Sequence, residues 1–155
     1  MQQTQAKVNS VILQEPAEIT IGGATYLMPH PTLGTLIMAS EKIAELPDFT
    51  LDLENAYGTV LRNARDCRPI ADIIAIFLLG AKAIEESRGM LGRCNADKLA
   101  RTLCLNATPK EFASVMKTIM EMIDVKDFFS VTTFLKEINL TAPKKVVNET
   151  TASGR

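Results

Sequence analysis

The chain has few of the residues on which enzymes and disulfide-stabilised domains depend. Of its 155 residues none is tryptophan, one is histidine and three are cysteines. An odd number of cysteines at irregular spacing argues against a disulfide framework, and no C-x-x-C pair is present for a metal or redox role. The N-terminal residues also lack the basic start and apolar core of a secretory signal. These absences favour a protein of a reducing cytoplasm.

Long apolar runs and a strong net charge are absent as well. The most apolar run, Ile73–Ala81, lies between Asp72 and Lys82, and a membrane span needs about 20 apolar residues. The net charge of −1 gives no bulk electrostatic reason to expect a nucleic acid or an anionic membrane as partner. The only basic cluster is Arg62, Arg65 and Arg68. It could meet an anionic patch on a partner, although a solvated helix face is the simpler interpretation.

The hydrophobic pattern predicts a mainly α-helical fold. One β-hairpin is expected over residues 17–28, because two short strand-like segments flank Gly22-Gly23, a pair suited to a tight turn with positive φ. Five apolar stripes and one short capped segment then predict about six helices. The domain organisation expected is a flexible N-terminal arm (residues 1–14), a single globular helical domain (15–140) and a flexible polar C-terminal tail (141–155).

The stripes also predict which helix faces are buried. The third helix, opened by Pro69, is apolar on nearly all sides and is expected to be the central buried helix. The two helices before it are each expected to bury one face, made of Leu33, Leu36, Ile37, Ile43 and Ala44 in the first and of Leu53, Ala56, Tyr57, Val60, Leu61 and Ala64 in the second.

The last ordered third of the chain is the most informative segment. Thr108-Pro109-Lys110-Glu111 has the pattern of a capping box with proline at the first helical position. The helix that follows is expected to bury Met116 and Met120 and to expose Met122, which could then serve as an adaptable binding residue. A final apolar set contains Val125, Phe128, Phe129, Val131, Phe134, Leu135 and Ile138. This segment points to packing and protein binding, and we predict Met122, Phe128, Phe129 and Phe134 as interaction residues.

The sequence contains no convincing grouping of catalytic residues. His30 lies between two prolines and is expected to be a turn residue, while Cys104, beside two leucines, is expected to be a small buried hydrophobe. Glu85 and Glu86 are adjacent on a helix, so their side chains diverge. Neither G-x-G-x-x-G nor a Walker pattern accompanies Gly22-Gly23. We therefore predict no catalytic residue, no cofactor and no metal site.

The order of these parts resembles the tail assembly chaperones of long-tailed, siphovirus-type bacteriophages and prophages. The resemblance covers residues 17–145 and rests on three segments, Ile19–Tyr26 leading into Pro31–Leu36, the helix Ile70–Ile76, and Asp127–Phe129 with Thr132–Leu135. It implies a non-enzymatic helical protein of the host cytoplasm that is absent from the mature virion. The implied partners are the tape measure protein and the major tail tube protein. The resemblance also raises the question of a translational frameshift near Pro143-Lys144-Lys145, where the codons CCA AAA AAG would supply a slippery string.

Two other interpretations stay open. The first is a generic cytosolic adaptor or dimerisation module that acts through the same C-terminal helices, with homo-oligomerisation left undecided. The second is a small enzyme, which would need convergent polar groups beside His30 or Cys104.

Overall fold

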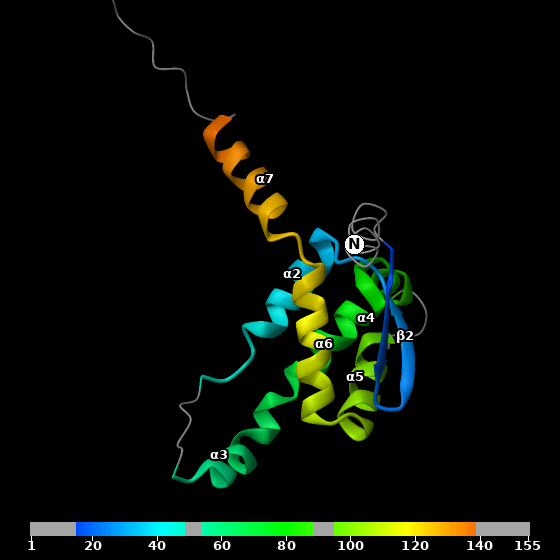
Figure 1. Ribbon diagram of the computed structural model, residues 1–155, viewed down its shortest axis with the longest axis vertical. Helices are drawn as coiled ribbons and strands as arrows, with labels where there is room; N and C mark the ends of the chain where they lie inside the picture. Colours follow the sequence, from blue (N-terminus) through cyan, green and yellow to red (C-terminus); the bar gives the residue numbers. More distant parts are fainter. Residues whose placement is uncertain (1–14, 49–53, 89–94, 139–155) are drawn as a thin grey trace, which may run out of the picture. The chain divides into compact units, whose positions relative to one another are not determined.

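The computed structural model describes residues 15–48, 54–88 and 95–138 of the chain. These residues form one two-stranded antiparallel hairpin and six α-helices, which confirms the fold class predicted from the sequence (Figure 1). The contacts divide the chain into two compact units, Met1–Ile123 and Asp124–Arg155. The last helix thus falls in the second unit, and the single domain expected over residues 15–140 stays a prediction. The predicted arm (residues 1–14) and tail (residues 141–155) lie outside the described residues.

The hairpin forms in the register that the sequence predicts. Strand β1 (Ala17–Ile21) pairs with β2 (Ala24–Met28), with Ile19 opposite Tyr26 and Ile21 opposite Ala24. Gly22 and Gly23 have φ values of 59° and 76°, a conformation that glycine adopts without the steric cost of a Cβ atom. The side chains alternate between the two faces, so that Ile19 and Ile21 are buried against the helices.

Helix α4 (Pro69–Arg88) is the centre of the first unit, as its apolar sequence predicts. It contacts α2 (Leu33–Ile43), α5 (Asn95–Asn106), α6 (Pro109–Met122) and β2 (Figure 1). Every residue from Ile73 to Leu78 is buried. The six largest side chains that are fully buried are Ile21, Met28, Ile74, Leu103, Ile119 and Thr35.

Helix α4 contains a break that the sequence did not predict. Gly80 has φ 76° and ψ 154°, so α4 consists of two helical segments joined at this residue. Ala81 starts the second segment, and its N–H therefore has no acceptor one turn earlier in the helix. The hydroxyl of Thr35 on α2 accepts this hydrogen bond at 3.1 Å. A buried side chain of one helix thus caps the start of another.

The inward face of α2 differs from the predicted one. Thr35 and Ala39 are buried against α4, whereas Leu33, Ile37 and Ile43 are exposed. Of the predicted face, only Leu36 packs against the core. The other positions were predicted wrongly because apolar content alone does not show that α4 requires a hydroxyl at this position. Small residues also permit close packing here, since a Cβ atom added to Gly34 would lie 3.2 Å from the Cβ of Ala81.

The predicted face of the next helix is exposed too. Helix α3 (Ala56–Asn63) continues into the short 3₁₀ helix η1 (Ala64–Cys67). Its one buried residue is Thr59, while Tyr57, Val60 and Leu61 face solvent. Leu53, which was expected on the same stripe, lies outside the described residues.

The predicted capping box at the start of α6 is confirmed. The Thr108 hydroxyl accepts from the Glu111 N–H at 3.3 Å, and the Glu111 carboxylate accepts from the Thr108 N–H at 2.7 Å. The second carboxylate oxygen of Glu111 accepts from the Gly22 N–H at 3.1 Å. One side chain therefore caps α6 and holds the hairpin turn, and sequence spacing predicts only the first of these contacts.

We expect Thr108→Ala to lower the free energy of unfolding by about 1 kcal/mol, because the Glu111 N–H loses its side-chain acceptor. Urea denaturation of the two proteins, followed by circular dichroism, measures the difference. Thr108→Ser, which keeps the hydroxyl, is the control. Identical midpoints for wild type and Thr108→Ala would show that the cap contributes no stability.

Glu111 should also make stability depend on pH. Hydrogen bonds from the Thr108 N–H and hydroxyl, and then from the Gly22 N–H, lower the pKa of this carboxyl below its ordinary value of 4.5. Because the folded pKa is the lower one, the stabilisation is complete above the unfolded pKa and is lost as the pH falls through the folded pKa.

Unfolding midpoints measured from neutral pH down to acidic pH test this expectation. Wild type should lose more stability than Glu111→Gln on acidification, so that the difference between the two proteins shrinks. A difference that stays constant over this range would contradict the assignment.

Candidate protein interaction site

Helix α7 (Val125–Ile138) is a well-formed amphipathic helix at the start of the second unit. The carboxylate of Asp124 accepts from the Asp127 N–H at 2.9 Å, the geometry of an N-terminal cap. Asp127 in the first turn and Lys136 in the last turn complement the helix dipole. Local sequence thus accounts for both the position and the polarity of α7.

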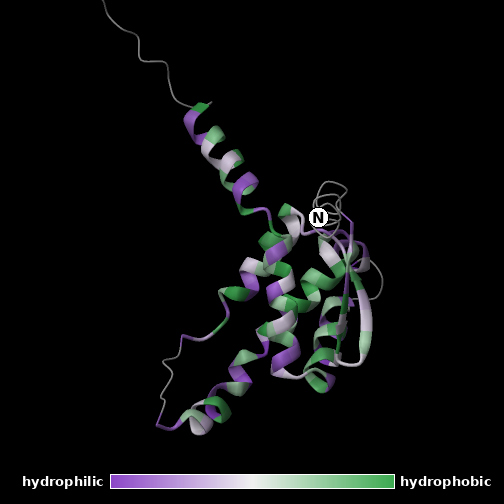
Figure 2. Cartoon of the chain, viewed as in Figure 1, coloured by the Kyte–Doolittle hydropathy of each residue, from purple (hydrophilic) through white to green (hydrophobic). Residues whose placement is uncertain are grey.

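The apolar side chains of α7 are unusually accessible. No residue of this helix is buried, although hydrophobic and hydrophilic residues alternate along it (Figure 2). Its exposed large apolar residues are Val125, Phe128, Phe129, Val131, Phe134, Leu135 and Ile138. An isolated helix of this length is marginal in water, because most helix stability in proteins comes from packing of an apolar face. These properties are typical of a segment that is covered by a partner.

The apolar residues of α7 occupy two different sides of the helix. Phe128, Val131, Leu135 and Ile138 follow one another at steps of three, four and three residues, which places them along one seam. Phe129 points about 100° away from Phe128 and is the more exposed of the two, at 61% against 41%. Their rings nevertheless touch edge to face, with centroids 5.6 Å apart.

Phe129 and Phe134 border a shallow depression on the surface of α7. Lys126, Ser130, Thr133 and Glu137 complete its lining. Its two aromatic rings are flanked by a cation, an anion and two hydroxyl groups. Such a surface can bind an apolar side chain of a partner and hydrogen-bond the polar groups beside it.

The structure brings together three of the four predicted interaction residues. Phe128, Phe129 and Phe134 are exposed on α7, whereas Met122 ends α6 and packs against the core of the first unit. Met120, which was predicted to be buried, is 68% exposed. The buried face of α6 is defined by Val115 and Ile119, and Met122 falls on that face at helical spacing while Met120 does not.

The first unit also contains a cleft between α2, α4 and α5, with a volume of about 410 Å³. Its lining is mixed in character: Met38, Glu41, Lys42, Asp72, Ile76, Ile84, Arg88, Ala96 and Asp97. Burial raises the pKa of the Asp72 carboxyl, which Lys42 and Arg68 partly offset. A hydrogen bond to Glu45 raises the pKa of the Lys42 ammonium. Among the described residues that line this cleft, no hydroxyl, thiol or imidazole accompanies the carboxylates, and Lys42 is paired with Glu45 at 2.8 Å.

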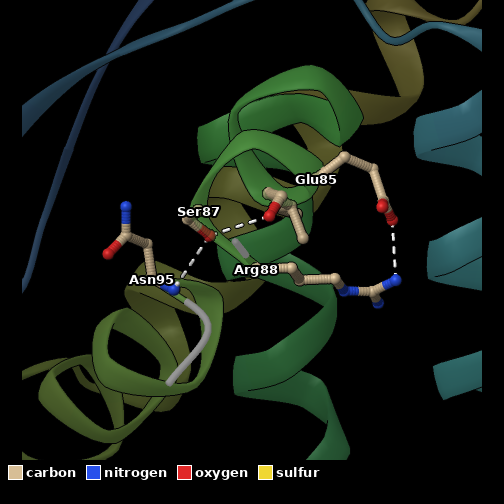
Figure 3. A network of polar contacts seen from close by, with 5 residues as sticks. Glu85, Ser87, Arg88 and Asn95 are labelled. Atoms are coloured by element: carbon tan, nitrogen blue, oxygen red, sulfur yellow. Dashed lines mark hydrogen bonds and ion pairs between the residues drawn. The ribbon is translucent and has the colours of Figure 1, made fainter. Parts of the chain in front are cut away.

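A small group of polar contacts surrounds the end of α4 and the start of α5 (Figure 3). Arg88 pairs with Glu85 at 2.7 Å. The Ser87 hydroxyl donates to the Ile84 carbonyl at 2.8 Å and accepts from the Asn95 N–H at 3.3 Å. The first backbone N–H of α5 is thereby satisfied by a side chain of α4. Of these contacts, the one between Ser87 and Asn95 joins the two helices, and the other two lie within α4.

The residues considered for catalysis lie apart from this cleft. His30 is half-buried after β2, and Cys67 is half-buried in η1. Cys104 is exposed on α5, which corrects the prediction that it is buried. The buried face of α5 consists of Ala96, Ala100 and Leu103, and Cys104 points to the side of it. In the part of the chain that the structure describes, no three His, Cys, Asp or Glu residues are grouped to hold a metal ion.

The outward apolar faces of α2 and α3 are candidate binding features that the sequence did not reveal, because their hydrophobic spacing is also that of a buried face.

Across residues 15–48, 54–88 and 95–138, no helix is long and apolar enough to cross a membrane. Comparison of the chain with known protein families, characterised proteins and solved structures finds no match.

Proposed function

We propose that this protein is a non-enzymatic phage tail assembly chaperone that binds the tape measure protein in the host cytoplasm and helps to recruit tail tube subunits. The observation that carries the proposal is α7, a helix with seven exposed large apolar residues and none buried. The resemblance to tail assembly chaperones supplies the class of partner. A long helical partner exposes apolar stripes during assembly, and a short amphipathic helix can cover such a stripe reversibly.

The exposed ring of Phe129 provides the sharpest test of this proposal. Phe129→Ala should weaken binding to the tape measure protein about tenfold, because aromatic anchors dominate the energy of such interfaces. The free energy of unfolding should change by less than about 0.5 kcal/mol, since the ring is mostly in solvent. Co-expression with a tape measure protein from the same genome, followed by quantitative pull-down, measures the loss.

Ser114→Ala, at an exposed position of α6 outside this depression, is the control and should bind like wild type. Equal capture of the tape measure protein by wild type and by folded Phe129→Ala would refute the role of this ring. A genome neighbourhood without a tape measure gene would remove the proposed partner.

A second candidate function is a dimerisation module. The seam of Phe128, Val131, Leu135 and Ile138 has the spacing of a coiled-coil interface, which is the observation that favours it. Light scattering across a range of protein concentrations separates the two functions. A dimer that Leu135→Lys dissociates would support the module, whereas a monomer that binds the tape measure protein supports the chaperone.

A further inference from the structure

Helix α3 carries an apolar surface that is exposed more fully than that of α7. Tyr57 is 89% exposed and Leu61 is 79% exposed, and Val60 lies beside them. Tyr57 and Leu61 are four residues apart, and Val60 is three residues after Tyr57, so the three side chains share one side of the helix. The side chain of Asn55 accepts from the Gly58 N–H at 3.2 Å and fixes the start of this helix.

Arg65 of η1 lies beside these apolar side chains, and Arg62 of α3 lies about 100° further round the helix from Leu61. Arg65 follows Leu61 by one turn and is 92% exposed, with a single contact of 3.3 Å to the adjacent Asp66. Arg62 is exposed and forms no ion pair with any other described residue. Residues 56–68 contain three arginines against one aspartate, although the whole chain has a net charge of −1. The segment is thus a local basic region in a slightly acidic protein.

The combination of an apolar stripe and nearby arginines favours one class of binding partner for this surface. An amphipathic helix with Asp or Glu beside its apolar face would bury Tyr57 and Leu61 and pair with the arginines at the rim. A nucleic acid would leave Val60 and Leu61 without a suitable contact, and Asp66 would repel its phosphates. A second copy of α7 is a poorer fit, because its two lysines balance Asp127 and Glu137.

We propose that α3 with η1 is a docking surface for an acidic amphipathic helix of a partner protein. Leu61 and Tyr57 anchor its apolar face, and Arg65 pairs with carboxylates at its edge. Arg62, further round the helix, adds to the local positive potential. This surface is separate in sequence from α7, so the proposal stands without the function proposed above.

The full chain can be titrated with a synthetic amphipathic peptide of about 20 residues built from Leu and Glu, which gives about five helical turns. Two matched peptides replace Glu by Lys or by Gln. Fluorescence anisotropy should show binding of the Leu/Glu peptide that weakens with added salt. Reversing both charges in Arg62→Glu/Arg65→Glu should weaken it about tenfold, and the control Arg101→Glu on α5 should leave it unchanged.

A second variant tests the apolar part of the surface. Leu61→Asp should abolish binding of the Leu/Glu peptide, while circular dichroism and the unfolding midpoint stay those of wild type because this side chain is exposed. Phe129→Ala on α7 should bind the peptide like wild type, which separates this surface from the one that carries the proposed function.

Several outcomes would overturn the proposal. Equal binding of the Lys and Glu peptides, or peptide binding that the arginine reversals do not change, would show that no acidic helix is selected. Binding of an oligonucleotide or of anionic vesicles that depends on Arg62 and Arg65 would assign the surface to a different class of partner. A concentration-dependent dimer that Leu61→Asp dissociates would assign it to self-association.

Discussion

Replacing Gly80 with alanine should lower the free energy of unfolding by about 3 kcal/mol. Gly80 joins the two segments of α4 with φ 76° and ψ 154°, a backbone conformation that is essentially restricted to glycine. An added Cβ would also lie 2.9 Å from the Cγ of Pro29, so the loop after β2 would have to move. Both effects act at the most buried helix of the protein.

Chemical denaturation of wild type and Gly80→Ala, monitored by circular dichroism, measures this loss. Gly23→Ala is the matched control, because Gly23 also has a φ of 76° but an added Cβ would meet no atom within 4 Å. It should cost only about 1 kcal/mol, the backbone strain alone. Equal midpoints for Gly80→Ala and wild type would mean that α4 runs through this residue as a regular helix.

Replacing Thr35 with valine should lower the free energy of unfolding by about 2 kcal/mol. The two side chains have nearly the same shape, so packing against α4 is kept. The Ala81 N–H loses its acceptor, however, and a buried donor without a partner costs the desolvation of that group. Because Thr35 is only 1% exposed, water cannot readily take the place of the hydroxyl.

Hydrogen exchange at the Ala81 amide gives a direct readout of the missing bond. Exchange should be faster in Thr35→Val than in Thr35→Ser, which keeps the acceptor and loses only a methyl group. Equal protection of this amide in the two variants would show that the Thr35 hydroxyl does not cap the second segment of α4.

Local features of the chain were predictable wherever the two interacting residues lie close together in the sequence. The Gly22-Gly23 turn and the capping box of Thr108 and Glu111 each involve residues a few positions apart, so spacing was enough to predict them. The burial of α4 followed from a helix that is apolar on nearly all sides, because any orientation of such a helix buries hydrophobic side chains. The exposure of Phe128, Phe129 and Phe134 did not follow from spacing, which is the same for a core helix and a binding helix.

By itself, then, the sequence determined the helices, the hairpin and its register, and the identity of the central helix. The tertiary structure alone decided which faces of α2 and α3 are buried and that the apolar side chains of α7 are exposed. Helix α2 turns Thr35 inward because the break at Gly80 leaves an N–H that needs an acceptor, and this requirement arises 46 positions away in the chain. A helix face is buried only where another part of the fold packs against it. The spacing of apolar residues along α3 and α7 does not show whether such a packing partner exists, so the exposure of their apolar faces could not be predicted.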